Sequence, residues 1–213
     1  MLTLYHGPQS RSSRIVRLLM EMDILDKVDV KIVGLVRQGK FGRPDPANPH
    51  PEGKVPLLVH DGAAIRESNA IILYLTDLFP GPMGPQTGDP LRGPYLSWLA
   101  YYGNVLEPVM VAAVLGITDP AFRNTFRGPE ELKAHLVEAL TDQPFLLGDR
   151  FTAADLIMVS AFAWLPAFTP DAPVVHDWVK RCEARPSAQA LAEYDAARLP
   201  ADAYGSESTA RKA

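Results

Sequence analysis

Apolar and polar residues along the first third of the chain follow spacings that predict a strand, a helix and a second strand. Residues 2–6 (LTLYH) predict a short strand, and residues 28–32 alternate apolar and charged side chains, as a half-buried strand does. Between them, four apolar residues recur at the i, i+3, i+4 and i+7 spacing of one helix face: Ile15, Leu18, Leu19 and Met22. A strand–helix–strand unit of this kind crosses over right-handed, so we expect the two strands to be parallel neighbours.

The next segment predicts a loop, a hairpin and a helix. Residues 36–53 are polar and rich in proline and glycine, which indicates a loop with at most one irregular helical turn. Val55–Val59 and Ala63–Arg66 predict antiparallel strands joined by a tight turn at Asp61-Gly62. Ser68 can cap a helix that ends at Pro80. The expected order is βαβ followed by ββα, which gives a mixed four-stranded sheet.

Residues 80–90 (PGPMGPQTGDP) hold four prolines and three glycines and therefore predict a linker between two domains. Beyond this linker the patterns predict helices only. The predicted helical stretches are 91–115, 120–140, 153–165, 174–184 and 187–197.

The pattern therefore predicts an α/β domain followed by an all-α domain. The predicted parts are an α/β domain over 1–79, the linker over 80–90, a helical domain over 91–198 and a C-terminal tail over 199–213.

Composition narrows the class of protein. The chain has 213 residues, of which 47% are hydrophobic and 22% charged, as in ordinary globular proteins. Its net charge of −4 comes with no long basic run, which argues against nucleic acid as a main partner. A single cysteine, Cys182, excludes an internal disulfide and fits a reducing compartment. No apolar stretch approaches the ~18 residues of a membrane span, and the first residues lack a signal-peptide pattern, so we expect a cytoplasmic protein without a membrane partner.

Four motifs together resemble the cytosolic glutathione transferase family over residues 1–198. They are a strand leading into a serine-rich helix start (LYHGPQSRSSR), the segment GKVPLL, Glu67-Ser68 at a helix start after a hairpin, and FTAADLIM in the helical part. In the last motif, Thr152 and Asp155 have the spacing of a capping box, which predicts a folding role rather than a chemical one. Residues 98–108 (WLAYYGNVLEP) and the short chain look most like bacterial members. The resemblance implies a thioredoxin-like fold for the first domain.

The resemblance also implies a glutathione site. In the thioredoxin fold the proline at Pro56 is cis, which would turn the backbone of Val55 toward the cysteinyl amide of glutathione. Ser68 and its backbone N–H would bind the γ-glutamyl carboxylate, since a helix N-terminus favours an anion. Glu67 would pair with the α-ammonium. An edge-strand proline and a plain helix cap are the alternatives without a ligand.

Lys54 and His50 are the two candidates for the glycyl carboxylate of glutathione. The family often has Asn-Pro-x-Gly-Lys-Val-Pro here, whereas residues 48–56 are two residues longer. The longer segment leaves the register of His50 open, and a solvated loop histidine is the alternative.

Activation of the glutathione thiol would come from a hydroxyl group. The serine-using classes of the family place that hydroxyl four residues before an arginine of the first helix, and Arg14 then selects Ser10. Ser12, which is also a good plain helix cap, and Tyr5 near the end of the first strand remain alternatives. No cysteine stands at the first helix start, so the resemblance predicts a serine-type enzyme rather than a cysteine-type one.

The second substrate would be a small apolar electrophile, in a pocket with Tyr102, Asn104 and Tyr101 on its helical wall. The expected function is therefore detoxification by a transferase that uses glutathione as co-substrate, with no metal. Alternatives are a glutathione-dependent isomerase or peroxidase, and a non-catalytic relative that binds a protein partner. The family also implies a homodimer.

Overall fold

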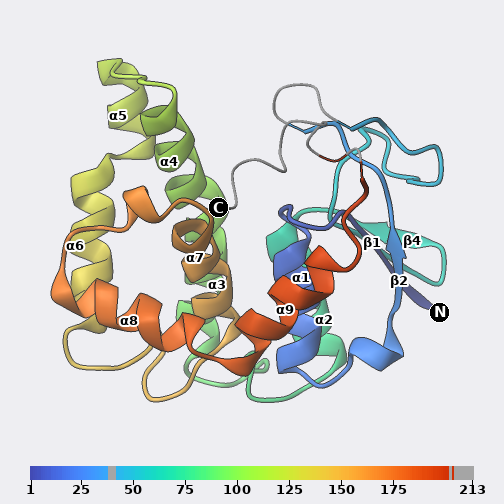
Figure 1. Ribbon diagram of the computed structural model, residues 1–213. Helices are drawn as coiled ribbons and strands as arrows, with labels where there is room; N and C mark the ends of the chain where they lie inside the picture. The colour runs from blue at the N-terminus through green and yellow to red at the C-terminus, as the bar shows by residue number, and fades with distance from the viewer. Residues whose placement is uncertain (38–41, 202, 204–213) are drawn as a thin grey trace. The chain divides into compact units, whose positions relative to one another are not determined.

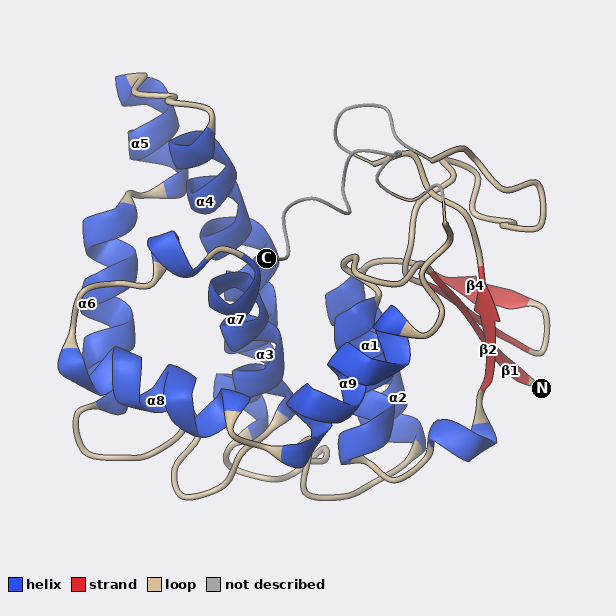
Figure 2. Ribbon diagram, viewed as in Figure 1, coloured by secondary structure: helices blue, strands red, loops and turns tan. Residues whose placement is uncertain are grey.

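A computed structural model describes residues 1–37, 42–201 and 203 (Figures 1 and 2). It divides into two compact units. The N-terminal unit contains Met1–Ile71 and the chain from Pro186 onward, and the helical unit contains Ile72–Arg185. In the described part of the chain, no helix combines the length and the apolar character that crossing a membrane requires.

The N-terminal unit is built on the predicted mixed sheet of four strands. The strands are β1 (Leu2–His6), β2 (Asp29–Ile32), β3 (Leu57–His60) and β4 (Ala63–Ile65), in the order β2-β1-β3-β4. The β1–β2 pair is parallel, whereas β3 is antiparallel to both β1 and β4 (Figure 2). The expected order and directions of the strands are confirmed.

Two helices accompany these strands in the predicted places. Helix α1 (Ser13–Glu21) follows β1 and buries the apolar face that its spacing predicts, while α2 (Ser68–Leu78) follows β4. A short 3-10 turn, Leu25–Lys27, precedes β2. The predicted loop has neither helix nor strand in its described residues 36–37 and 42–53. The core residues of α1 and the sheet that have no exposed surface are Leu4, Ile15, Val16, Leu18, Leu19 and Leu58.

Helix α9 (Pro186–Ala196) packs against α1, within the N-terminal unit (Figure 1). Arg17, a buried side chain of α1, donates from Nε to Ser187 Oγ at 3.1 Å, and Ser187 in turn donates to Glu21. This differs from the expected division, which grouped residues 187–197 with the helical domain. Helical spacing predicts that a segment is a helix, but it does not reveal which of the two units the helix packs in. The linker over residues 80–90 stays a prediction.

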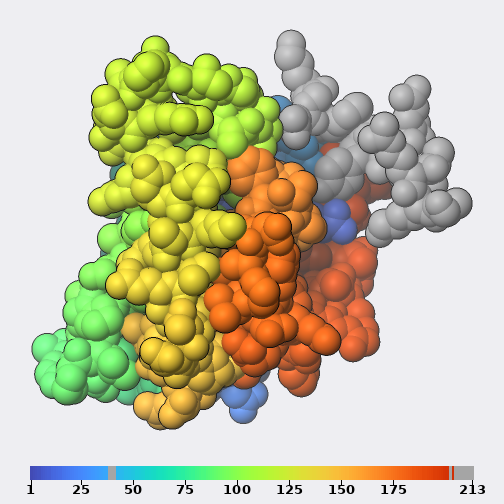
Figure 3. Space-filling model, turned by 90° about the vertical axis from the view of Figure 1, so that its left-hand side faces the viewer, coloured from blue at the N-terminus to red at the C-terminus, as the bar shows by residue number. Residues whose placement is uncertain are grey.

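The helical unit contains the part of α2 from Ile72 onward and the remaining helices. They are α3 (Arg92–Tyr101), a π-helix (Tyr102–Leu106), α4 (Glu107–Val114), α5 (Pro120–Phe126), α6 (Pro129–Leu140), α7 (Ala153–Trp164), a 3-10 turn (Pro166–Phe168) and α8 (Pro173–Glu183). The stretch expected over 120–140 is two helices, because Arg127 has a left-handed φ of 69° and Gly128 then starts α6. Side chains of α6 and α8 lie side by side on the face that Figure 3 shows.

Helix α7 forms the centre of the helical unit and contacts both α3 and α8. Its residues are buried on all sides from Ala153 to Val159, as expected of a helix enclosed by others. The capping box predicted at Thr152 and Asp155 is present at its start.

Asp155 does more than cap α7. Its Oδ2 accepts hydrogen bonds from the N–H and the hydroxyl of Thr152, at 2.9 and 3.1 Å. Its Oδ1 accepts from Leu146 N–H at 2.8 Å and from Trp178 Nε1 at 2.9 Å. Burial raises the pKa of the Asp155 carboxyl, against the lowering effect of these four donors. One carboxylate thus joins the start of α7, the chain before it and the middle of α8.

We predict that Asp155→Asn lowers the free energy of unfolding by about 2–4 kcal/mol, because an asparagine offers one acceptor oxygen and leaves buried donors unpaired. Urea denaturation measures the difference. Asp177→Asn, an exposed change on α8, is the matched control and should stay within about 0.5 kcal/mol of wild type. Equal stability of the two variants would contradict the role of Asp155.

Candidate functional site

The loop from β1 to α1 closes around the Ser12 hydroxyl, which has no exposed surface. Ser12 Oγ accepts a hydrogen bond from Gly7 N–H at 3.0 Å and lies 3.1 Å from the Gly7 carbonyl oxygen, to which it can donate. It also lies 2.7 Å from His6 Nδ1. Ser12 occupies the N-cap position of α1, but its hydroxyl points back into this loop and makes no capping hydrogen bond. Burial removes Ser12 from contact with a ligand.

His6 links Ser12 to helix α9. Its ring is fully buried, with Nδ1 on Ser12 and Nε2 3.0 Å from Asp195 Oδ1 of α9. An ionised carboxylate only accepts hydrogen bonds, so Nε2 carries a hydrogen. In the neutral ring, Nδ1 is then the acceptor for the Ser12 hydroxyl. The carboxylate therefore fixes the tautomer of the histidine.

Asp195 also holds the loop through its second oxygen. Oδ2 accepts from Gln9 N–H at 2.6 Å and from the Ser13 hydroxyl at 2.5 Å. Burial by itself would raise the pKa of the Asp195 carboxyl, but the hydrogen bonds from His6, Ser13 and Gln9 outweigh it and bring the pKa below its ordinary value. The carboxylate is thus the charged form that this part of the structure favours.

Ser10 is a partly exposed member of the cluster. Its hydroxyl donates to the Gly7 carbonyl at 2.6 Å, its oxygen accepts from Ser12 N–H at 3.1 Å, and the two hydroxyl oxygens of Ser10 and Ser12 are 2.8 Å apart. Its single proton can point to the Gly7 carbonyl, to Ser12 or to a ligand. Among the three hydroxyl groups considered above, the structure links Ser10 to His6 and also leaves it accessible.

Tyr5 lies on the other side of the sheet from this cluster. Side chains alternate along a strand, so Tyr5 and His6 point to opposite faces of β1. The Tyr5 ring is paired with Lys31 across the parallel strands, and the Lys31 ammonium lies 5.9 Å from the ring centre. This geometry favours Ser10 over Tyr5.

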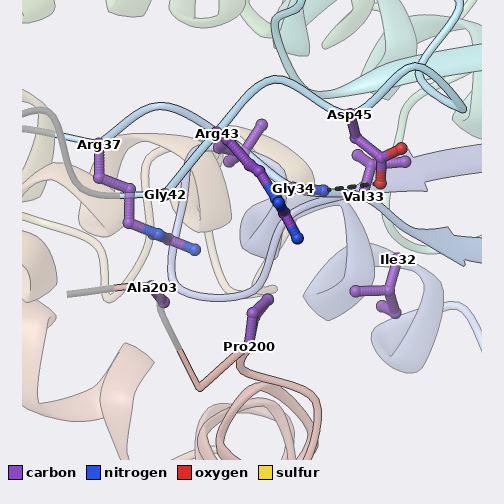
Figure 4. A pocket seen from close by; sticks show the side chains of 10 residues that line it. Ile32, Val33, Gly34, Arg37, Gly42, Arg43, Asp45, Pro200 and Ala203 are labelled. Atoms are coloured by element: carbon purple, nitrogen blue, oxygen red, sulfur yellow. Dashed lines mark hydrogen bonds between the residues drawn. The ribbon is translucent and has the colours of Figure 1, made fainter. Parts of the chain in front are cut away.

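Arg37 holds the loop from the side of β2. It donates to the Pro8 carbonyl at 2.5 Å and to the Gln9 carbonyl at 3.0 Å, where Gln9 has a left-handed φ of 53°. Arg37 and Arg43 point into a hollow of about 240 Å³ that Pro200 and Ala203 bound from the other side (Figure 4). The hollow is thus cationic on one side.

Asp45 fixes the wall of that hollow. Its carboxylate accepts from Gly34 N–H at 3.1 Å and from Ala47 N–H at 2.9 Å (Figure 4). These backbone hydrogen bonds, first from Ala47 and then from Gly34, lower the pKa of the Asp45 carboxyl.

The expected glutathione contacts before β3 divide into exposed and buried groups. The Val55–Pro56 peptide bond is cis, and Val55 is half-buried just outside the β1–β3 pairing, which starts at Leu57. Lys54 is exposed. His50 is 8% exposed, and its Nδ1 accepts from Glu52 N–H at 3.1 Å, so its ring stabilises the loop itself. Of the two candidates for a carboxylate, Lys54 is the accessible one.

The residues at the start of α2 have a strained backbone. Glu67 has a φ of 67°, which costs a non-glycine residue roughly 1–3 kcal/mol. Its carbonyl accepts from Ile71 N–H at 3.0 Å, so α2 starts directly behind it and Ser68 is its first residue. Strain of this kind clusters at ligand sites. Ser10, Pro56, Glu67 and Ser68 all belong to the N-terminal unit.

The candidates for an electrophile pocket lie in the helical unit. Tyr102 is 2% exposed and starts the π-helix, while Asn104 is exposed. Tyr101 packs against Trp98 and His135, with ring centres 5.7 and 4.9 Å apart, and burial raises its pKa. A π-helix often marks a functional segment. The pocket itself stays a prediction.

Sequence reasoning missed three residues of this site: His6, Arg37 and Asp195. His6 was visible as the last residue of a strand directly before the serine-rich segment. Asp195 is 183 positions from Ser12, and nothing in a helical spacing pattern connects the two. Among the described residues, no group of three or more histidine, cysteine or acidic side chains could hold a metal ion.

Comparisons with known proteins agree on one family. The model named "Glutathione S-transferase, N-terminal domain" matches residues 4–83, and "Glutathione S-transferase, C-terminal domain" matches residues 122–186. Together they match more than half of the chain. The chain is 31% identical over 118 residues to "Glutathione S-transferase GstA" of Escherichia coli O157:H7, covering 54% of this chain and 59% of that protein.

A second relative is of another kind. The chain is 32% identical over 149 residues to "Elongation factor 1-gamma" of Danio rerio, covering 64% of this chain and 33% of that protein. The chain therefore spans less than two thirds of both curated relatives. In fold, it matches a sphingomonad glutathione S-transferase complexed with glutathione, with a TM-score of 0.70, 24% identity, and 91% of this chain and 98% of that chain covered.

We predict that Asp195→Asn destabilises the protein in a pH-dependent way. Because the folded pKa of Asp195 lies below its ordinary value of 3.8, the carboxylate contributes stability above that pH and loses it as the pH falls toward the folded pKa. The wild-type advantage in urea denaturation should be about 1–3 kcal/mol near pH 7 and should shrink below about pH 4. Glu193→Gln, on the exposed side of α9, is the control. A pH-independent difference would contradict the role of the charge.

Proposed function

Because the chain belongs to the glutathione S-transferase family, we propose that it transfers the thiolate of glutathione to a small apolar electrophile. The observation that carries this proposal is the Ser10 hydroxyl, partly exposed at the start of α1 and hydrogen-bonded into a buried polar chain. The N-terminal unit also contains Val55 beside the cis proline and Ser68 at the start of α2.

Glutathione binding follows from the charges of these groups. The γ-glutamyl carboxylate would lie at the N-terminus of α2, where Ser68 and free N–H groups favour an anion. Glu67 would pair with the α-ammonium, and the backbone of Val55 would pair with the cysteinyl amide. Lys54 would pair with the glycyl carboxylate, since it is exposed and His50 is buried.

Activation of the thiol requires a modest stabilisation of the thiolate relative to the thiol. A thiol with a pKa near 8.5 requires about 2.7 kcal/mol to become mostly thiolate at neutral pH. A hydroxyl that donates to a charged acceptor contributes about 1.5–3 kcal/mol. The N-terminus of α1, a nine-residue helix, adds about 0.3–1 kcal/mol. Ser10 meets both conditions, so it is our choice for the group that donates to the sulfur.

The electrophile would contact Tyr101 and Asn104, while Tyr102, which is 2% exposed, would support this wall of the pocket from behind. The chain would work as a cytoplasmic homodimer, as the family resemblance implies. The same thiolate would also serve an isomerase or a peroxidase. The likeness to elongation factor 1-gamma favours a second candidate of another class, a protein that keeps the fold and binds a protein partner.

Isothermal titration with glutathione and with S-hexylglutathione tests the proposal. We expect both to bind in a one-to-one ratio with the chain, and the hexyl form to bind more tightly, because its alkyl group would bury apolar surface. Binding of glutathione without any gain from the hexyl group would contradict an apolar second site. Failure of both ligands to bind would overturn the transferase and favour the protein-binding alternative.

We predict that Ser10→Ala lowers turnover at least about tenfold and leaves glutathione affinity within a few-fold, since the hydroxyl stabilises the thiolate rather than the peptide backbone. Steady-state conjugation of a chromogenic aryl halide measures turnover, and calorimetry measures affinity. Ser97→Ala on α3, which removes an exposed hydroxyl bonded to its own helix, is the control. Lost affinity with unchanged turnover of the bound complex would contradict this role for Ser10.

A further inference from the structure

A continuous line of hydrogen bonds runs from the partly exposed Ser10 to a buried carboxylate. The oxygens of Ser10 and Ser12 are 2.8 Å apart, Ser12 Oγ is 2.7 Å from His6 Nδ1, and His6 Nε2 is 3.0 Å from Asp195 Oδ1. His6 and Ser12 have no exposed surface, and Asp195 is 3% exposed. The line has the order hydroxyl, hydroxyl, imidazole and carboxylate, which is the order of a proton path that ends on a base.

We propose that His6 takes up the proton of the glutathione thiol through the hydroxyls of Ser10 and Ser12, and that Asp195 holds His6 in the receptive tautomer. This proposal rests on the function proposed above. It differs from activation by a single hydroxyl donor in one respect, the destination of the proton. A lone donor leaves the thiol to lose its proton to solvent, whereas the path keeps the proton inside the protein.

The proton transfer balances atom by atom. The thiol proton moves to Ser10 Oγ, the Ser10 proton moves to Ser12 Oγ, and the Ser12 proton moves to His6 Nδ1. The products are a thiolate and an imidazolium, with no change in total charge. The Asp195 carboxylate accepts from Nε2–H before and after the transfer and stabilises the imidazolium by charge.

Before and after the proton transfer, each hydrogen of the path has a hydrogen-bond acceptor. Before transfer, Ser12 donates to His6 Nδ1 and Ser10 donates to Ser12 or to the Gly7 carbonyl, which is 2.6 Å away. After transfer, the imidazolium Nδ1–H donates to Ser12, Ser12 turns to the Gly7 carbonyl at 3.1 Å, and Ser10 donates to the thiolate. The Gly7 carbonyl thus offers the alternative acceptor that lets the hydroxyls turn.

Other charged and titratable groups surround His6. The Tyr194 ring of α9 lies 6.1 Å from the His6 ring, and the guanidinium of Arg198, just after α9, lies 3.7 Å from the centre of the Tyr194 ring. Burial raises the pKa of Tyr194, so this phenol stays neutral. From the loop after β2, Arg37 is bonded to the Pro8 and Gln9 carbonyls. Asp195 is therefore the carboxylate in direct contact with the ring.

The number of protons released to the buffer on binding distinguishes proton transfer to His6 from proton loss to solvent. Glutathione is titrated calorimetrically into the full-length protein at neutral pH in two buffers that differ in ionisation enthalpy, which gives the protons released on binding. The ultraviolet absorbance of the thiolate gives the number of thiolates formed. S-methylglutathione, which lacks the thiol, measures and removes any other proton change. For the wild type we expect thiolate formation with close to zero protons released to the buffer.

Two variants interrupt the path at different points. In His6→Gln and in Ser12→Ala, we expect each thiolate that forms to release about one proton to the buffer, and the pKa of the bound thiol to rise by about one unit or more. Asp195→Asn, which leaves the histidine but removes its charge partner, should raise the thiol pKa in the same direction. Glu193→Gln on α9 is the matched control and should behave as wild type. Urea denaturation of each variant confirms that it is folded under the assay conditions.

Release of about one proton per thiolate by the wild type would overturn the proposal, and so would an unchanged proton count in both His6→Gln and Ser12→Ala. Either result would leave the transferase itself intact, with Ser10 as a simple donor. Failure of the wild type to bind either glutathione or S-methylglutathione would instead refute the proposed function and the proton path with it.

Discussion

The hydrogen bonds of Asp195 are the interaction on which the candidate site depends. A carboxylate in a largely water-free position is costly unless its oxygens are fully paired, and here the histidine, a hydroxyl and a backbone N–H provide that pairing. All three donors belong to the segment from the end of β1 to the start of α1. Helix α9 therefore helps to fix the conformation of the loop between β1 and α1. Arg17 and Ser187 make the same connection further along α1 and α9.

A second buried carboxylate organises the helical unit, and the comparison shows why only one of the two suggests chemistry. Asp155 accepts from two N–H groups, a hydroxyl and an indole, none of which takes up a proton at neutral pH. Asp195 accepts from a histidine, whose second nitrogen faces a hydroxyl. Similar burial and similar hydrogen-bond counts thus give a folding role in one unit and a proton-handling arrangement in the other.

The sequence predicted what local spacing and the family resemblance determine. Period-two alternation at residues 28–32, the Asp61-Gly62 turn and the capping box at Thr152 each depend on neighbours within a few residues, and each is present in the structure. The break at Arg127 was missed although Gly128-Pro129 directly after it is a sequence signal for a turn and a new helix start. The pairing of Asp195 with His6 joins positions 189 residues apart, and only the packing of α9 on α1 brings them together.

The hydrogen bonds of the loop also bear on whether this network exists only for folding. The Ser12 hydroxyl has one proton, so while it donates to His6 Nδ1 it cannot also donate to the Gly7 carbonyl. Ser10 then donates to that carbonyl and accepts from Ser12 N–H, and among Ser10, Ser12 and His6 it is the residue with exposed surface. A site that must deliver a proton from a bound ligand to a buried base needs a hydroxyl at this exposed edge, and that position is the physical reason to assign Ser10 to chemistry and Ser12 to its support.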